Sequence, residues 1–233
     1  MKLGIISAMD SEHRQLAERL QEKKEICDGG FKYVEGTLGA NQVVLTQCGI
    51  GKVNAAIGTA ELIRRYQPDC IISTGVAGGI DTCLNVTDVV VSSQVAYHDV
   101  WCGDGNEHGQ VQGLPLYFEG YAPLVEHAVA LNQLPELESK IHAGLICTGD
   151  QFISDQAQLA TIKQHFPQGL ACDMESAAIA QTCHLYGVNF ISFRIISDTP
   201  GAHEDNFNQY LDFWGTMAER SFRTTWAFLT GIQ

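Results

Sequence analysis

The amino-acid sequence predicts an α/β domain in which helices cover a mixed β-sheet. Short apolar runs typical of buried strands, such as KLGIIS, alternate with segments of helical periodicity along the chain. Two strand-like runs flank Gly39, Ala40 and Asn41 and predict a hairpin, which makes the sheet mixed rather than purely parallel. Because no repeat, low-complexity stretch or linker interrupts this pattern, residues 1–233 are expected to form a single domain.

Each predicted element has its own pattern and boundary signals. Asp10 or Ser11 caps the first helix, Pro68 closes the second, and Pro167 closes the fourth. Glycines after the strand DCIISTG predict a turn over GVAGGI, and residues 98–120 are irregular and Gly-rich. In order, we expect strand 2–7, helix 10–22, strands 31–38 and 41–49, helix 52–66, strands 69–75 and 88–97, helix 122–134, strand 142–149, helices 155–166 and 174–186, strand 189–197 and helix 206–229.

Composition excludes several classes of function. Hydrophobic residues make up 45% of the 233 residues, enough for a well-covered core. With 14 Lys and Arg against 27 Asp and Glu, the net charge of -13 repels phosphate backbones and anionic lipid. We therefore expect no nucleic-acid partner and no membrane binding, and no apolar run reaches 18 residues.

The N-terminus and the cysteines predict a cytoplasmic protein. MKLGIISAMDSEH resembles a first strand followed by acids, without the cleavage site of a signal peptide. The eight cysteines are scattered and form no C-x-x-C motif, so we expect them to act as small buried hydrophobic residues rather than as disulfides.

Two glycine motifs and one polar run do not match known sites. CGIGKV lacks the first glycine of a phosphate loop and has Val53 where Ser or Thr is required, and GVAGGI lacks the spacing of a dinucleotide fingerprint. The run YHDVWCGDGNEHG contains metal-ligand residue types, but their spacing matches no known metal site. We expect neither a metal nor a cofactor, and interpret Gly75, Gly78 and Gly79 as a tight turn or a ligand-binding strand end.

Three acids at the ends of predicted strands or the starts of predicted helices suggest a catalytic crevice. Glu12 and Glu175 begin helices, where the helix dipole alone could explain an acid, and Asp173 is a candidate cap for the second of these helices. Asp198 closes the buried run FRIIS before Pro-Gly, where partial desolvation raises the pKa of a carboxyl and lets it donate a proton, although an Asx turn is the alternative. Arg194, in the same run, requires an acceptor such as Glu12 or Glu175.

The blocks MKLGIISAMDSE, CGIGKVNAA, STGVAGGI, TGDQFI, DMESAAIAQ and RIISD carry a family resemblance. In order and spacing they resemble the bacterial 5′-methylthioadenosine/S-adenosylhomocysteine nucleosidases of the nucleoside phosphorylase-like superfamily, from residue 1 to about residue 215. The resemblance implies a three-layer αβα sandwich, a homodimer, and hydrolysis of the adenine–ribose bond of methylthioadenosine, S-adenosylhomocysteine and 5′-deoxyadenosine.

The same resemblance implies roles for individual residues. Glu12 would activate water, and Asp198 would protonate N7 of the leaving adenine. The remaining members of the implied site bind substrate or support the two acids: Glu175 and Met174 at the ribose, Phe152 and the Ile153 backbone at the base, Phe207 and Ile50 lining the pocket, and Arg194 and Ser197 beside the water and the acid. Such a pair of carboxyls parallels the logic of glycoside hydrolysis.

Two departures from the family pattern bear on the positioning of the attacking water and on the preferred 5′-substituent. Val76 stands where the family usually has Ser, which is expected near the attacking water. The loop that normally supplies aromatic residues to the 5′-substituent pocket reads VWCGDGNEHGQ, where Trp101 is a candidate substitute. The alternatives are a purine nucleoside phosphorylase, disfavoured because Ser73 replaces the phosphate-binding Arg, an aminodeoxyfutalosine nucleosidase, and a non-catalytic purine-nucleoside binding module.

Overall fold

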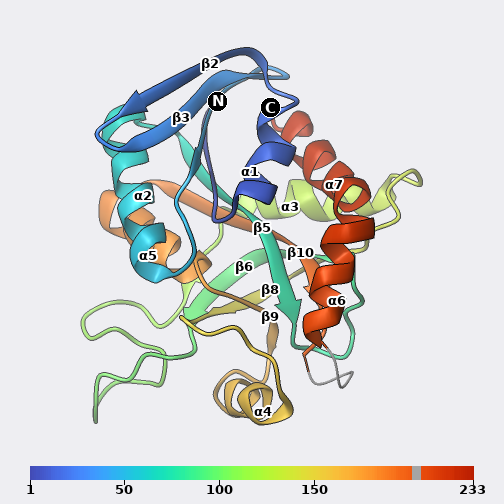
Figure 1. The fold of residues 1–233 in the computed structure, drawn as a ribbon. Coiled ribbons are helices and arrows are strands. Elements are labelled where there is room, and N and C mark those ends of the chain that lie inside the picture. The colour runs from blue at the N-terminus through green and yellow to red at the C-terminus, as the bar shows by residue number, and fades with distance from the viewer. Residues whose placement is uncertain (201–205) are drawn as a thin grey trace.

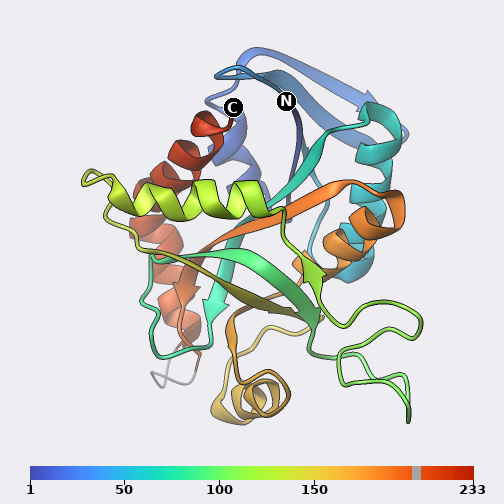
Figure 2. The ribbon, with the colours of Figure 1, turned by 180° about the vertical axis from the view of Figure 1, so that it is seen from behind.

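A mixed β-sheet with helices on both faces forms the molecule (Figures 1 and 2). The structure, a computed structural model, describes residues 1–200 and 206–233. Helices α2 (Lys52–Tyr66) and α5 (Ser176–Tyr186) cover one face, while α1 (Asp10–Ala17), α3 (Ala122–Ala130) and α7 (Ala218–Gly231) cover the other. The predicted three-layer α/β class is confirmed.

The sheet partly closes on itself. Its order is β10-β6-β8-β9-β5-β1-β4-β3-β2, and β10 also pairs in parallel with β5, so that β10, β6, β8, β9 and β5 form a ring. The short β7 pairs with β6. The strands are β1 (Lys2–Ser7), β2 (Gln21–Asp28), β3 (Phe31–Leu38), β4 (Asn41–Gln47), β5 (Cys70–Gly79), β6 (Val89–Tyr97), β7 (Phe118–Glu119), β8 (Ile141–Thr148), β9 (Gly169–Asp173) and β10 (Asn189–Asp198).

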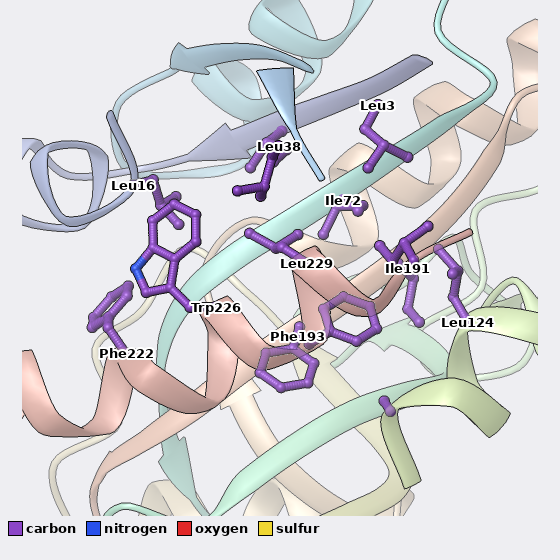
Figure 3. Packing of buried hydrophobic residues seen from close by; sticks show 14 of the residues in the cluster. Leu3, Leu16, Leu38, Ile72, Leu124, Ile191, Phe193, Phe222, Trp226 and Leu229 are labelled. Carbon is purple, nitrogen blue, oxygen red and sulfur yellow. The ribbon is translucent and has the colours of Figure 1, made fainter. Parts of the chain in front are cut away.

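Neighbouring residues along the central strands pack into different cores, because successive side chains of a strand point to opposite faces. Ile72 of β5 belongs to the cluster beneath α1, α3 and α7, whereas Ile71 belongs to the cluster beneath α2 and α5. Figure 3 shows the first cluster, in which Trp226 and Leu229 of α7 pack toward the strands beside Phe193. Burial on both faces explains why these strands are continuous apolar runs rather than alternating ones.

A third cluster connects α4 (Gln156–His165) to the ring of strands. Ile162 and Phe166 pack there with Ile80, Leu145 and Cys147. Helix α4 begins where its cap residue Asp155 accepts hydrogen bonds from the backbone N–H groups of Ala157 and Gln158. The segment between β8 and α4 is therefore held at both ends, which matters because it borders the site described below.

Several predicted boundaries are wrong for identifiable reasons. The first helix ends at Ala17, and residues 21–28 form the edge strand β2, which is almost entirely exposed and so lacks an alternating pattern. GVAGGI is not a turn, because β5 continues through Gly79 and pairs with β9 at Gly78 and Gly79. Strand β9 itself was not predicted from the sequence.

The C-terminal helix and the cysteines also differ from expectation. The helix is divided into α6 (Asn206–Asp212), a π-helical turn at Phe213–Met217, and α7. All eight cysteines are free, but Cys27, Cys83 and Cys102 are exposed rather than buried. Within the described ranges, no helix has the length and apolar character needed to cross a bilayer.

Candidate active site

A cavity of about 190 Å³ lies where β1, β5, β9 and β10 end. Of the ten residues predicted for the site, nine line it, and Arg194 lies behind its wall. The lining residues are Ala8, Met9, Glu12, Ile50, Val76, Ala77, Gly78, Gln151, Phe152, Ile153, Cys172, Asp173, Met174, Glu175, Ser197, Asp198, Phe207 and Tyr210. The fold thus brings segments that are far apart in the chain, from Ala8 to Tyr210, to one cavity.

Glu12 is held rigidly at the start of α1. Its Oε2 accepts hydrogen bonds from the backbone N–H groups of Ala8 (3.0 Å) and Met9 (2.9 Å), and its Oε1 accepts one from Val76 (3.1 Å). The side chain is buried, and burial raises its pKa above the ordinary value, while Arg194 and the N–H donors oppose that rise. A carboxyl with fixed geometry and raised proton affinity is suited to accept a proton.

Gly75 makes room for this carboxyl. A Cβ at position 75 would collide with the Glu12 carboxylate and would lie 2.8 Å from Nη1 of Arg194. The φ of +153° also disfavours other residues. The glycine therefore serves a close approach within β5 rather than the predicted turn.

Arg194 of β10 is the buried cation behind the cavity. Its Nε lies 3.0 Å from Oδ2 of Asp173, and its Nη2 lies 3.6 Å from Oε2 of Glu175. Nη2 also donates to Ser73 Oγ at 2.9 Å. The expected carboxylate neighbour is present, although Asp173 is closer than either acid named from the sequence.

Asp173 anchors Arg194 more than it caps α5. Besides Arg194, its carboxylate accepts a hydrogen bond from Thr148 Oγ1 (2.6 Å), one from the Ser176 hydroxyl, and a longer one from the Ser176 N–H (3.3 Å). The cap position of α5 is occupied by Glu175, whose side chain makes no capping bond. The predicted cap role of Asp173 is therefore only a minor part of its contacts.

Glu175 faces the cavity and has an unusual proton affinity. Its Oε1 accepts a hydrogen bond from the Gly51 N–H at 2.9 Å. Burial raises the pKa of Glu175 to about 7, with Arg194 opposing the rise and Asp173 adding to it. Three buried carboxyls, Glu12, Asp173 and Glu175, thus surround one guanidinium.

Asp198 ends β10 on the same cavity. The pairing of β10 with β5 shifts between Ile196 and Asp198, an irregularity that re-aims side chains and lets Ser197 and Asp198 both line the cavity. Ser197 Oγ donates to Asp198 Oδ1 at 2.7 Å, and Asp198 is buried. The two acids predicted to cooperate, Glu12 and Asp198, therefore share one cavity despite their separation in sequence.

Aromatic side chains form the outer wall. The ring centroids of Phe152 and Phe207 lie 6.3 Å apart, and those of Phe152 and Tyr210 lie 5.8 Å apart. Phe152 and Phe207 are exposed, so their faces are available to a flat ligand. Sequence reasoning missed Tyr210 and Met9, which are joined by a hydrogen bond from Tyr210 Oη to Met9 Sδ (3.3 Å). Tyr210 could have been found, since it follows Phe207 by three residues on one helix face.

The polar run at 98–108 lies elsewhere. Trp101 is exposed, stacks loosely on His108 with centroids 6.4 Å apart, and is not part of the cavity wall in this chain. In the described residues, no cluster of three His, Cys, Asp or Glu side chains is arranged to hold a metal ion.

Comparison with known proteins decides the family. Residues 2–230 match the model of the phosphorylase superfamily. A 5′-methylthioadenosine/S-adenosylhomocysteine nucleosidase of Tolumonas auensis is 44% identical over 215 residues, covering 91% of this chain and 93% of that protein. A nucleosidase of the same name from Staphylococcus aureus is 43% identical and covers 90% and 92%. This chain belongs to the 5′-methylthioadenosine/S-adenosylhomocysteine nucleosidase family.

Solved nucleosidase structures share the whole architecture of this family member. The S-adenosylhomocysteine nucleosidase of Streptococcus pyogenes, in complex with 5-methylthiotubericidin, has a TM-score of 0.92 at 34% identity and covers 100% of this chain and 98% of that one. The Neisseria meningitidis nucleosidase, in complex with methylthio-immucillin-A, has a TM-score of 0.92 at 37% identity, with 99% of each chain covered.

The arrangement provides the groups that a nucleosidase needs. A flat aromatic wall, a buried carboxyl beside a hydroxyl, and a second carboxyl fixed by three N–H donors face one small space. Such a set can bind a planar base, donate one proton and accept another.

Proposed function

We propose that this chain hydrolyses the N-glycosidic bond of 5′-substituted adenine nucleosides and releases adenine and a 5-substituted ribose. The observation that carries the proposal is the convergence of Glu12 and Asp198 on one cavity, with Glu175 beside them. Family membership and the nucleoside analogues in the related structures support the substrate class. Because the cavity draws on residues 8 to 210, we propose that the whole chain acts as one catalytic domain.

In the proposed mechanism the C1′–N9 bond breaks as its electron pair moves into the purine. Asp198 donates a proton to N7, which neutralises the leaving adenine, and the Ser197 hydroxyl at 2.7 Å holds the resulting carboxylate. Water attacks C1′ and passes its proton to Glu12, whose raised pKa favours that transfer. Each carboxyl thus handles one proton per turnover, and the fixed geometry of both stabilises the oxocarbenium-like transition state.

The remaining site residues bind the substrate in this proposal. Phe152 stacks on the adenine, and the Ile153 backbone contacts the edge of the base. Glu175, pinned by the Gly51 N–H, accepts hydrogen bonds from the ribose hydroxyls, with Met174 on the same face.

Two exposed or half-exposed apolar groups serve the 5′-substituent. Ile50 and Phe207 line the cavity and are exposed at its rim, so they are placed to contact a methylthio or similar apolar group. Arg194 holds Asp173 and Glu175 in place from behind the wall.

Hydrolysis is favoured over phosphorolysis by the charge of the site. Ser73 stands where the phosphorylases have a phosphate-binding Arg, and it accepts a hydrogen bond from Arg194. The positive charge of Arg194 is already balanced by Asp173, Glu175 and Glu12. A phosphate ion would meet more negative than positive charge there.

Adenine release from methylthioadenosine, S-adenosylhomocysteine, 5′-deoxyadenosine and aminodeoxyfutalosine, each with and without phosphate, tests the proposal. We expect phosphate-independent release from the first two. Strict dependence on phosphate would establish a phosphorylase instead. Tight nucleoside binding without release of base would establish a binding module.

We also propose that the chain forms a homodimer through the outer face of α2. Ile50, Val53 and Ile57 are exposed at a spacing that places them on one side of the helix and its entry, and Leu185 of α5 is exposed nearby in the same layer. The position of this stripe beside the Ile50 rim supports a partner contact close to the 5′-substituent pocket. Light scattering should give twice the 25.5 kDa mass of the chain, and Val53→Glu should reduce the measured mass to that of a single chain.

The cytoplasmic location stays a prediction.

A further inference from the structure

Three charged side chains outside the cavity join three segments of the chain, two of which continue into residues that line it. Lys52 begins α2, Asp99 follows β6, and Asp150 follows β8. The Lys52 ammonium lies 2.7 Å from Asp99 Oδ2, and the same oxygen accepts the Asp150 N–H at 2.9 Å. Asp150 returns the contact, because its Oδ1 accepts the Lys52 N–H at 2.8 Å. The three residues therefore form a closed network of hydrogen bonds.

Two members of the network, Lys52 and Asp150, adjoin residues that line the cavity or hold a lining side chain. Gly51, which precedes Lys52, donates its N–H to Glu175. Gln151, Phe152 and Ile153, which follow Asp150, line the cavity. Its members do not line the cavity themselves, so the network connects the backbone that holds Glu175 to the loop that carries Phe152, one ring of the aromatic wall.

The Lys52–Asp99 pair is the shielded part of the network, whereas the Asp150 side chain is 47% exposed. The side chains of Lys52 and Asp99 are 22% and 18% exposed, and the ammonium sits 5.5 Å from the centroid of the Tyr97 ring. Partial burial weakens solvent screening, and the charge on both partners strengthens their hydrogen bonds. Loss of the ammonium would leave the Asp99 carboxylate with the Asp150 N–H as its one donor among the described residues.

We propose that Lys52, Asp99 and Asp150 are positioning residues that preset the base-binding loop and the Glu175 anchor before the nucleoside arrives. The role rests on the proposed function, since it assumes that the base lies against residues 151–153. A preset loop loses little conformational entropy on binding. If the network is broken, ordering even one backbone residue at the time of binding weakens affinity roughly tenfold.

A second ion pair in the chain provides a matched control. Lys163 of α4 lies 2.7 Å from Asp81 Oδ2, with side chains 23% and 30% exposed, and it also donates to the Gly169 carbonyl. Neither Lys163 nor Asp81 lines the cavity. The two lysines thus have the same pairing distance and nearly the same burial, but only Lys52 adjoins cavity-lining groups.

The test compares Lys52→Met with Lys163→Met in full-length protein. For each, KM and kcat for methylthioadenosine, the Kd for adenine by calorimetry, and Tm are measured. We expect Lys52→Met to raise KM and the adenine Kd together by roughly tenfold, with a smaller change in kcat. Both variants should lower Tm by similar amounts, since the two ion pairs are alike in distance and burial. Lys163→Met should nevertheless leave KM and the adenine Kd unchanged.

Further variants keep the proposal falsifiable. If Lys52→Met does not fold, Asp99→Asn is measured instead, and should raise both constants in the same direction by a smaller factor. The double variant should cost no more binding than the larger single change, because both break one network. Equal KM and Kd for the Lys52 and Lys163 variants would overturn the proposal. Adenine binding without any hydrolysis by the parent would contradict the proposed function while leaving the positioning test intact.

Discussion

Glu12→Gln separates catalysis from binding most sharply. The glutamine has the same shape, but its amide can offer an acceptor on one side only. Placed where Oε2 now lies, its oxygen keeps the bonds from Ala8 and Met9, and its NH₂ group then faces the Val76 N–H as donor against donor. The Val76 N–H and the amide N–H that faces it both lack an acceptor, and each unsatisfied donor costs about 1–3 kcal/mol of folding stability.

The catalytic loss should be much larger than the structural one. Glutamine cannot accept the proton of the attacking water, so kcat should fall by on the order of 10²–10⁴-fold. Adenine binding should be unchanged, since Glu12 does not contact the base in the proposed mechanism. Adenine release, followed by chromatography, gives kcat, calorimetry gives the Kd of adenine, and denaturant unfolding gives the stability.

Two results would refute the reasoning. A kcat for Glu12→Gln within a few-fold of the parent's would show that Glu12 is not the base, because so small a loss is typical of a minor positioning effect. Parallel loss of turnover and adenine affinity would show that its three hydrogen bonds serve to build the pocket.

Three further predictions follow from the same geometry. Asp198→Asn should lose nearly all turnover of adenine nucleosides but should still bind adenine. Ser197→Ala should lose less turnover, because it removes only the hydroxyl that supports Asp198. Normal turnover by Asp198→Asn would rule out Asp198 as the acid. The free energy of unfolding of Glu175→Gln should rise relative to that of the parent as pH increases from 4.5 to about 7, since in this range the folded parent holds a proton that the unfolded chain releases. A constant difference in unfolding free energy between the two proteins across this range would contradict the raised pKa. Gly75→Ala should reduce kcat far more than Gly30→Ala. The new methyl group at position 75 would meet Glu12 and Arg194, whereas a methyl group at position 30 would have no atom within 4 Å. Equal activity of the two variants would contradict the close approach at position 75.

Local patterns were sufficient for most of the elements. Helix α2 spans the predicted residues 52–66, and the hairpin of β3 and β4 turns at the predicted glycine, because periodicity and breakers act over short distances. Strand β2 escaped prediction because an exposed edge has no core to impose alternation. Strand β9 escaped because five residues that pair with distant strands carry little local signal.

The sequence by itself determined which residue types could perform the chemistry. Glu12, Glu175 and Asp198 stood out because all three fall just beyond buried strands or at helix starts, positions that can converge on one crevice in a layered α/β domain. Only the tertiary structure decided their surroundings: Asp173 rather than Glu12 pairs most closely with Arg194, burial raises the pKa of Glu175 to about 7, and Tyr210 joins the aromatic wall. Proton affinity and pairing depend on desolvation and on charges a few ångströms away, and those neighbours come from segments far apart in the chain.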